Sequence, residues 1–329
     1  MVALPEAADG SANENDQSVQ DSPPRRRRYV RAPSNKSLVT LTPIKIQMLR
    51  FLAECRFLSL PQLARLCCPS ERADLSEKNA RRHMRALFDA GLVDVLPVSR
   101  LALAAPDAPN DAALLYGSAP NLYVPTKHAP ELLHQAGVIG KEMLKQVVPN
   151  YGPKNSLFLA HELQVRDVRV WLEVSAKASG GEQRVIKWKD GQEAIIEEGS
   201  CKARPDAWFV YRVGEQKGRE AVLVGLVEVD LGTEHGDKRW LEKLMAYDAL
   251  FSSGSLRTAT GYVNARILVI VPNARRRDQL SGFIAKQAGA TPPRVWLATR
   301  ADLDTIAANN AVWRRAGSPI LVPLVDMSY

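Results

Sequence analysis

The chain has 329 residues, of which 46% are apolar and 24% are charged. These values are ordinary for a globular protein and exclude a fibrous or wholly disordered chain. Its 44 basic and 36 acidic side chains leave a net charge of +8, which favours a polyanionic partner such as nucleic acid. The longest apolar run, residues 221–229, is too short to cross a membrane and contains Glu228.

The four cysteines, Cys55, Cys67, Cys68 and Cys201, have none of the spacings of a zinc site. We expect reduced, buried thiols of the kind found in a reducing compartment. The N-terminus lacks the basic and then apolar order of a signal peptide. These features, together with the length, predict a soluble, cytoplasmic protein with two domains.

Residues 1–37 are rich in Ser, Asn, Asp and Pro and are predicted to form a disordered tail. Its first 24 residues carry five acids and no base, whereas residues 25–31 carry five arginines. Such a run is either a nucleic-acid-binding arm or a solvated tail, and both interpretations stay open. The four consecutive arginines are Arg25, Arg26, Arg27 and Arg28.

Order is predicted to begin in the segment 38–140 with two helices. The first has Thr42 as its N-cap and Pro43 at its first helical position, where the missing N–H costs nothing. The second, shorter helix has Ser59 and Gln62 at the two positions of a capping box.

A third helix is expected from Ser76, as its N-cap, to Gly91, as its terminating glycine. Two strands follow at residues 92–98 and 121–126, separated by an insert rich in Ala, Pro, Asp and Asn. Three helices followed by a hairpin is the order of a winged helix-turn-helix. We therefore predict a winged-helix DNA-binding domain over residues 38–140.

A further helix, a linker and a second domain are expected after these strands. Thr126 is expected to cap a helix that ends at Gln135. Residues 141–155 contain Pro and Gly and are predicted to link this domain to a second one over residues 156–329. In that segment long helical patterns alternate with strand patterns, which predicts an α+β or α/β domain with a mixed sheet and helices on both faces.

The strands expected in the second domain include a hairpin over residues 184–196, with Asp190 and Gly191 in its turn. Two stronger strands, residues 203–213 and 220–230, are expected to pair with each other because a short polar loop joins them.

Three acidic residues gather in that pair of strands. Glu228 and Asp230 occupy alternate positions, so both side chains are expected on one face. The pairing places Asp206 opposite Glu228 or the residue before it. Three carboxylates this close repel one another, and a divalent cation such as Mg²⁺ or Mn²⁺ removes the repulsion. The alternative is that the acids are solvated or pair with Lys202, Arg204 or Lys238.

Pro205-Asp206, with Glu228-Val229-Asp230 on the next strand, resembles the core of PD-(D/E)xK nucleases. The segments RPDAWFV, LVEVDLGTEH and KLMAYDAL, preceded by LAHELQV, resemble the replication-relaxation family of plasmids and mobile elements. The resemblance covers most of residues 40–255. It implies a winged helix followed by a PD-(D/E)xK-like domain, and a part in plasmid replication, DNA relaxation or mobilisation.

The resemblance assigns roles to four residues. Asp206 and Glu228 match the metal ligands of the nuclease core, and Glu162 is a candidate for the acid that the first helix supplies. His161 matches a histidine of the family and is a candidate catalytic residue. The other interpretation of His161 is a histidine that only makes a hydrogen bond.

The sequence departs from the nuclease pattern at Asp230, where a lysine is expected. Asp230 is therefore a candidate for a further ligand or for polarising water. Lys243, on the following helix, is expected to reach back in place of the missing lysine, with Tyr247 one turn further along the same face. A solvated helix face is the alternative for both residues.

The third helix of the N-terminal domain carries four bases opposite an apolar stripe: Lys78, Arg81, Arg82 and Arg85. At the recognition-helix position they are expected to contact DNA, mostly its phosphates. The alternative is a solvated helix surface.

The leading hypothesis is thus a protein that binds double-stranded DNA and nicks or cleaves it with Mg²⁺ or Mn²⁺. The rival is a non-catalytic regulator or accessory factor with a degenerate nuclease fold. Replication or mobilisation proteins are the other expected partners, and homodimer formation is left open.

Overall fold

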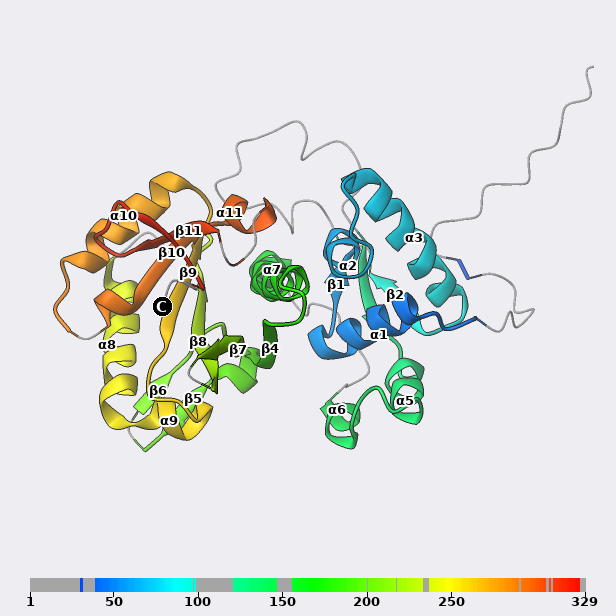
Figure 1. The fold of residues 1–329 in the computed structure, drawn as a ribbon, viewed down its shortest axis with the longest axis horizontal. Coiled ribbons are helices and arrows are strands. Elements are labelled where there is room, and N and C mark those ends of the chain that lie inside the picture. Colours follow the sequence, from blue (N-terminus) through cyan, green and yellow to red (C-terminus); the bar gives the residue numbers. More distant parts are fainter. Residues whose placement is uncertain are drawn as a thin grey trace, which may run out of the picture.

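The protein is described here by a computed structural model. The residues that it describes are 30–31, 39–96, 98, 121–146, 156–199, 201–216, 218–232, 237–289, 291–305, 308 and 310–325. Figure 1 shows two parts, an N-terminal group of helices with a small sheet and a C-terminal part built on a large sheet, with one long helix between them. No helix in the described part of the chain has the length and apolarity needed to cross a membrane.

The N-terminal part contains the three helices and the hairpin that the sequence predicts. One additional short strand, β1, pairs with β3, so the small sheet is antiparallel with the order β1-β3-β2. Its elements are α1 (Pro43–Cys55), β1 (Leu58–Ser59), α2 (Leu60–Cys67), α3 (Ala73–Asp89), β2 (Val93–Leu96), β3 (Leu122–Pro125), α5 (His128–Gln135) and α6 (Lys141–Gln146).

Two helix starts in this part agree with the prediction. Helix α1 has Thr42 at its N-cap and Pro43 at its first position. The capping box of α2 is complete, because the Ser59 amide donates to Gln62 Oε1 over 2.9 Å and the Gln62 amide donates to Ser59 Oγ over 3.4 Å. Local chemistry is sufficient to determine both starts.

Two other predicted caps are wrong. Helix α3 begins at Ala73, and Ser76 lies inside it with its hydroxyl donating to the Cys68 carbonyl over 2.5 Å. That bond ties the end of α2 to α3. Thr126 does not cap α5, which begins at His128, because its hydroxyl donates to the Gly91 carbonyl over 2.7 Å. In both cases a non-local acceptor takes the hydroxyl that was expected to cap a helix.

The C-terminal part has a mixed sheet of seven strands in the order β12-β11-β10-β9-β8-β7-β4, as the predicted fold class requires. Strands β8, β9 and β10 are parallel, and the other pairs are antiparallel. The strands are β4 (Arg184–Asp190), β7 (Ala207–Gln216), β8 (Arg219–Val229), β9 (Arg266–Val271), β10 (Val295–Thr299), β11 (Ala311–Arg315) and β12 (Leu321–Pro323).

Helices cover both faces of this sheet. One face packs on α8, α9 and α10, and the other packs on α7 and α11. The helices are α7 (Ser156–Ala178), α8 (Asp237–Ser253), α9 (Ser255–Thr260), α10 (Ala274–Ala285) and α11 (Arg300–Thr305).

The predicted hairpin over residues 184–196 is wrong. Strand β4 pairs with β7 and forms one edge of the large sheet. Gly191 starts a short 3-10 helix, and β5 (Ile196–Glu198) pairs instead with β6 (Cys201–Ala203) in a separate two-stranded sheet. The apolar partner offered by β7 determines the position of β4 more strongly than the Asp-Gly turn signal does.

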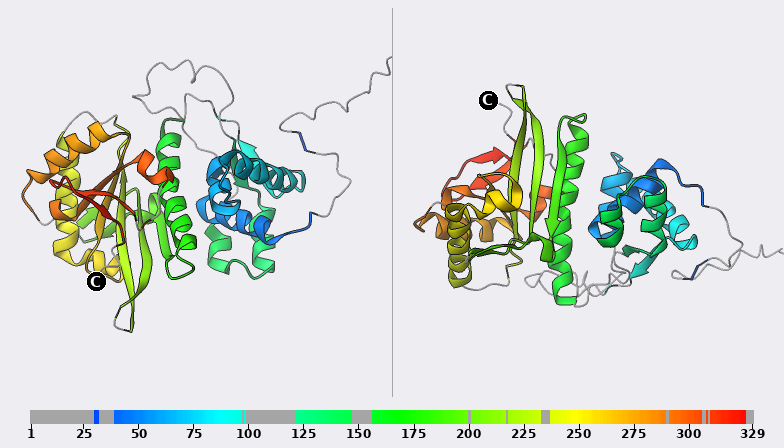
Figure 2. Two further views of the ribbon diagram at one scale, coloured as in Figure 1. Left: turned by 45° about the horizontal axis from the view of Figure 1, so that its top comes forward. Right: turned by 90° about the horizontal axis from the view of Figure 1, so that it is seen from below.

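Helix α7 contributes to the cores of both parts. Val170 belongs to the N-terminal core, while Val168 and Trp171 belong to the core under the large sheet. Figure 2 shows α7 running beside the large sheet, with the N-terminal part on its other side. Polar contacts add to this packing, since buried Gln62 donates through Nε2 to Asp167 Oδ1 over 2.7 Å.

The four cysteines are free and buried, as predicted. Burial raises the pKa of Cys55 to about 11 and that of Cys67 to about 12. Neither thiol therefore forms the reactive thiolate near neutral pH.

Candidate functional site

The pairing of β7 with β8 brings Asp206 and Glu228 together. Ala207 pairs with Val227, and the Asp206 amide donates to the Val227 carbonyl over 2.9 Å. Asp206 therefore precedes the first residue of β7 and lies opposite Glu228, in the register that the sequence predicts. Both acids lie at this end of the strand pair, where α7 contributes His161 from one face of the sheet and α8 contributes Lys243 from the other.

Asp206 is held by a histidine and a backbone amide. His161, from α7, places its Nε2 3.1 Å from Asp206 Oδ2, and the Val229 amide donates to the same oxygen over 2.8 Å. Burial disfavours the charged imidazole, but the hydrogen bond and charge of Asp206 outweigh it and raise the His161 pKa. Burial likewise opposes ionisation of Asp206, and His161 and Val229 outweigh it, so the Asp206 pKa is lowered.

Glu228 is held by two side chains of α8. Its carboxylate is only 1% exposed, with Lys243 Nζ 2.7 Å from Oε2 and the Tyr247 hydroxyl donating to Oε1. Burial raises the Glu228 pKa, and Lys243 offsets part of that rise. Lys243 also lowers the Asp206 pKa by its charge, so one ammonium stabilises the ionised form of both acids. Both residues face the site, and the interpretation of Lys243 and Tyr247 as a solvated helix face is wrong.

Asp230 shares the face of Glu228 but has different partners. Arg276, from α10, places its Nη2 2.7 Å from Asp230 Oδ2, and Trp240 Nε1 donates to the same oxygen over 3.1 Å. The Gly232 amide donates to the other oxygen over 2.7 Å. Asp230 therefore ties α8 and α10 to the end of β8. None of these partners is among the bases expected from the sequence.

Glu162, the third proposed metal ligand, lies one residue after His161 on α7. Its side chain is 41% exposed, and its Oε2 lies 3.4 Å from Arg166 Nη1. It lines the same cavity as Asp206. In this arrangement it pairs with an arginine and makes no contact with the other two acids.

The arrangement does not present a preformed site for Mg²⁺ or Mn²⁺. Both Glu228 oxygens are occupied by Lys243 and Tyr247, and Asp206 Oδ2 is occupied by His161 and an amide. Within the described ranges, no group of three or more His, Cys, Asp or Glu side chains has the geometry of a metal site. Ion binding by Asp206, Glu228 and Glu162 therefore stays a prediction.

Three ionisable side chains of the site are partly exposed to solvent. The side chains of His161, Asp206 and Lys243 are 27%, 21% and 21% exposed, whereas Glu228 and Tyr247 lie behind them. An imidazole with a raised pKa beside a carboxylate, with an ammonium nearby, can move a proton and stabilise a developing negative charge.

The His161–Asp206 pair makes stability depend on pH. A raised His161 pKa stabilises the folded state fully below the unfolded value near 6.5, and this contribution is lost as pH rises through the folded-state pKa. We expect His161→Gln to lower the free energy of unfolding by about 1–2 kcal/mol at pH 5.5 and by less at pH 9. Urea unfolding at both pH values measures this. His128→Gln, at an exposed histidine, is the control, and an equal loss at both pH values for His161→Gln contradicts the pairing.

The bases of α3 lie as expected for three of the four residues. Lys78, Arg81 and Arg82 are exposed on the helix surface opposite the buried stripe Ala80, Met84, Leu87 and Phe88. Arg85 is instead turned along the helix, with Nε and Nη2 each 3.0 Å from an Asp89 carboxylate oxygen. Arg25, Arg26, Arg27 and Arg28 lie outside the described residues.

Sequence reasoning missed Arg276 as the partner of Asp230, and Arg31 on the surface of α3 and β2. Arg276 follows Asp230 by 46 residues, and nothing local connects them. Arg31 Nε donates to the Phe88 carbonyl over 3.0 Å, and its guanidinium pairs with Asp94. Its place at the end of the arginine run was the available signal.

In a comparison with protein-family models, residues 49–265 match the family described as replication-relaxation. This stretch covers more than half of the chain and includes both α3 and the Asp206 site. The chain belongs to the replication-relaxation family. Membership associates it with the replication of plasmids and mobile elements. No curated protein and no solved structure matches significantly.

Proposed function

We propose that this member of the replication-relaxation family binds duplex DNA through its N-terminal part, acting as a winged helix-turn-helix. The observation that carries the proposal is the cationic surface of α3, where Lys78, Arg81 and Arg82 are exposed opposite a buried stripe. Exposed bases at fixed positions of a rigid helix suit a row of phosphates.

The surrounding geometry supports this role for α3. Helices α2 and α3 are tied together by the Ser76 hydroxyl, and the β1-β3-β2 sheet packs beside them. The order of three helices, with a small antiparallel sheet and a long insert between β2 and β3, fits a recognition helix and a wing. The net charge of +8 favours the same partner.

Duplex binding is tested by its salt dependence. If three bases of α3 contact phosphates, the slope of log K against log salt has a magnitude of at least about 2.7 for a B-form duplex. Fluorescence anisotropy with a labelled duplex, measured between about 50 and 200 mM salt, gives this slope. Absence of binding at the lowest salt contradicts the proposal.

A second candidate function is phosphodiester cleavage by the C-terminal part, interpreted as PD-(D/E)xK-like. It is favoured by the meeting of Asp206, Glu228 and Lys243 from three segments of the chain. In this function Lys243 would take the place of the lysine missing at Asp230. His161 would exchange a proton at Asp206 Oδ2. The occupied oxygens of Glu228 favour the opposite view, a non-catalytic accessory factor, because a metal ion would have to displace Lys243 and Tyr247.

Cleavage is tested with supercoiled plasmid in the presence of Mg²⁺ or Mn²⁺. If the site is catalytic, wild-type protein produces nicked circles, and Asp206→Ala and Glu228→Ala each lower the rate at least about 100-fold. Glu242→Ala, at an exposed acid of α8, is the matched control and should cleave like wild type. Intact plasmid with wild-type protein and both ions contradicts the catalytic function and supports the accessory factor.

A further inference from the structure

We infer that the cavity beside Asp206 is a binding site for a phosphate group, held by Arg204, Arg56 and Arg166. The inference rests on the proposed function to the extent that the phosphate belongs to a DNA strand. It adds to that function a second point of contact, at the junction of the two parts of the chain.

The cavity has a volume of about 410 Å³ and is lined by residues from four places in the fold. Arg56 comes from the end of α1, His161 and Arg166 from α7, Gly191 from the turn after β4, and Arg204 from the segment that leads to Asp206. It is therefore formed only when the N-terminal part, α7 and the large sheet are assembled.

The acids that line the cavity already have partners. Asp190 Oδ1 accepts a hydrogen bond from Arg56 Nη2 over 2.9 Å, Glu162 pairs with Arg166, and Asp206 pairs with His161. Each of the three acids thus has an arginine or the imidazole as its partner, and Arg204 is the cation of the cavity lining that stands outside these three pairs.

Two arginines in this cavity have N–H groups for which no acceptor is found among the described residues. Arg204 is exposed and makes no side-chain hydrogen bond with any residue of the described ranges, and its charge acts on Glu197, which also pairs with Lys202. Arg166 is 2% exposed, with its Nε and Nη1 donating to the Cys55 and Glu162 carbonyls over 2.9 and 2.7 Å. Its Nη2 is buried and has no hydrogen-bond partner among the described residues. An oxyanion in the cavity supplies acceptors of the kind that guanidinium groups bind best.

The backbone conformation of Arg56 is a further indication of a binding site at this cavity. Of the described non-glycine residues it alone has a positive φ, 69°. Such strain is concentrated at ligand-binding and catalytic positions. A glycine would adopt this backbone without strain, whereas Arg56 places a guanidinium in the cavity lining at this position.

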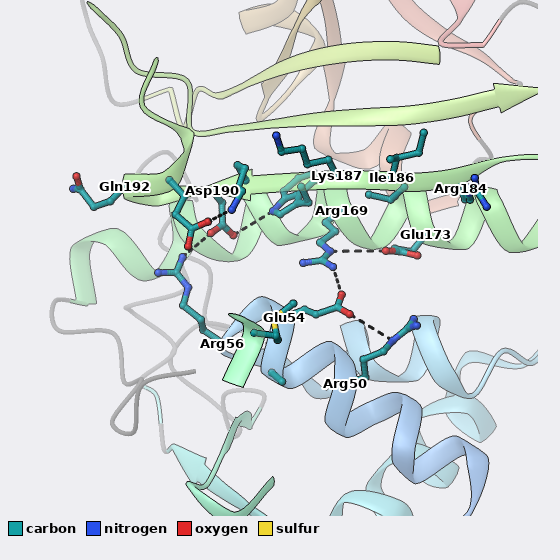
Figure 3. Close-up of a pocket in the computed structure, with 16 residues that line it drawn as sticks. Arg50, Glu54, Arg56, Arg169, Glu173, Arg184, Ile186, Lys187, Asp190 and Gln192 are labelled. Carbon is teal, nitrogen blue, oxygen red and sulfur yellow. Dashed lines mark hydrogen bonds and ion pairs between the residues drawn. The ribbon is translucent and has the colours of Figure 1, made fainter. Parts of the chain in front are cut away.

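The phosphate site adjoins a larger cavity of about 680 Å³ between α1, α7 and β4. The two cavities share Arg56, Asp190 and Gln192, which lie together at one end of the larger cavity in Figure 3. Arg50 and Arg184 continue the row of arginines towards its other end, where Arg50 lies 3.6 Å from Glu54 and Arg184 lies 3.2 Å from Glu220. This continuity favours the backbone of a single nucleic-acid strand as the occupant, because its phosphates recur along the groove.

The test compares Arg204→Ala with Lys202→Ala in the full chain. Lys202 lies two residues earlier, carries the same charge, pairs with Glu197 and does not line the cavity. Binding of a labelled single-stranded oligonucleotide is measured by anisotropy over a range of salt. We expect Arg204→Ala to weaken binding about tenfold at 0.1 M salt and to reduce the salt slope by about 0.7, the value for one contact with a single strand. Lys202→Ala should stay within about twofold of wild type.

A second arm uses inorganic phosphate as the competitor. Phosphate should displace the oligonucleotide from wild-type protein better than chloride at equal ionic strength, and Arg204→Ala should remove this difference. Binding of inorganic phosphate to the wild-type protein, measured directly by calorimetry, with no measurable binding of the oligonucleotide would support the phosphate site and contradict its assignment to a strand. Equal behaviour of the Arg204→Ala and Lys202→Ala variants in both arms overturns the inference. Blunt duplex binding through α3 is measured separately, so failure of either proposal is distinguishable from failure of the other.

Discussion

Replacing Lys243 with methionine is expected to lower the free energy of unfolding by about 3–5 kcal/mol, because it leaves the Glu228 carboxylate buried without its cation. Glu228 is 1% exposed, and the Lys243 ammonium lies 2.7 Å from it. Tyr247 would be its remaining partner at that end of β8. Methionine keeps most of the length of the lysine stem, so the change removes mainly the charge.

The loss of stability in Lys243→Met should also depend on pH. Burial raises the pKa of Glu228, and loss of Lys243 raises it further. The folded protein then binds a proton that the unfolded chain releases, so stability increases as pH falls. Urea unfolding should therefore show a smaller deficit for Lys243→Met at pH 5 than at pH 8.

Two variants make this prediction specific. Glu228→Gln combined with Lys243→Met should recover most of the lost stability, because the uncompensated charge is gone. Lys238→Met, at a lysine of the same helix whose side chain is 89% exposed, should change stability by no more than about 0.5 kcal/mol. If Lys243→Met were as harmless as Lys238→Met, Lys243 would not be the group that compensates Glu228.

Reversing two charges on α3 should abolish most duplex binding. Arg81→Glu with Arg82→Glu replaces two exposed cations by anions on the surface assigned to the phosphates. We expect the affinity at 0.1 M salt to fall at least about 100-fold and the salt slope to shrink by about 1.8, which corresponds to two phosphate contacts. Anisotropy with the duplex used for the wild-type salt titration measures both quantities.

A matched control separates local contact from net charge. Lys141→Glu with Lys145→Glu makes the same change in net charge on α6, whose lysines are exposed and which lies away from α3 in Figure 1. This variant should keep most of the affinity. Equal losses in the two variants would show that only the overall charge matters, and an unaffected α3 variant would exclude α3 as the DNA-binding surface.

Local patterns in the sequence were sufficient for much of the fold. The helical spacing of apolar residues and the capping box at Ser59 and Gln62 predicted α1 and α2 correctly. The pairing of β7 with β8 followed from their apolar runs and the short loop between them. That pairing in turn placed Asp206 opposite Glu228, and the return of α8 placed Lys243 beside both.

The errors arose where the deciding partner lies in another element of the fold. The Ser76 and Thr126 hydroxyls bond to carbonyls of other elements, so rules for local caps could not place them. Asp230 is bound by Arg276, which is carried to it only by the parallel pairing of β8 with β9 and the helix that follows. Such contacts depend on the assembled sheet, which a single sequence does not show.

The contribution of α7 to two hydrophobic cores limits how this protein can evolve. An exchange of the N-terminal part between relatives by recombination before residue 156 would separate α1 from Arg169 and α2 from Asp167. The partners of Glu54 and Gln62 would then come from a different lineage, with mismatched packing around Val170. Helix α3 and the Asp206 site are thus expected to be inherited together, as one unit rather than as interchangeable modules.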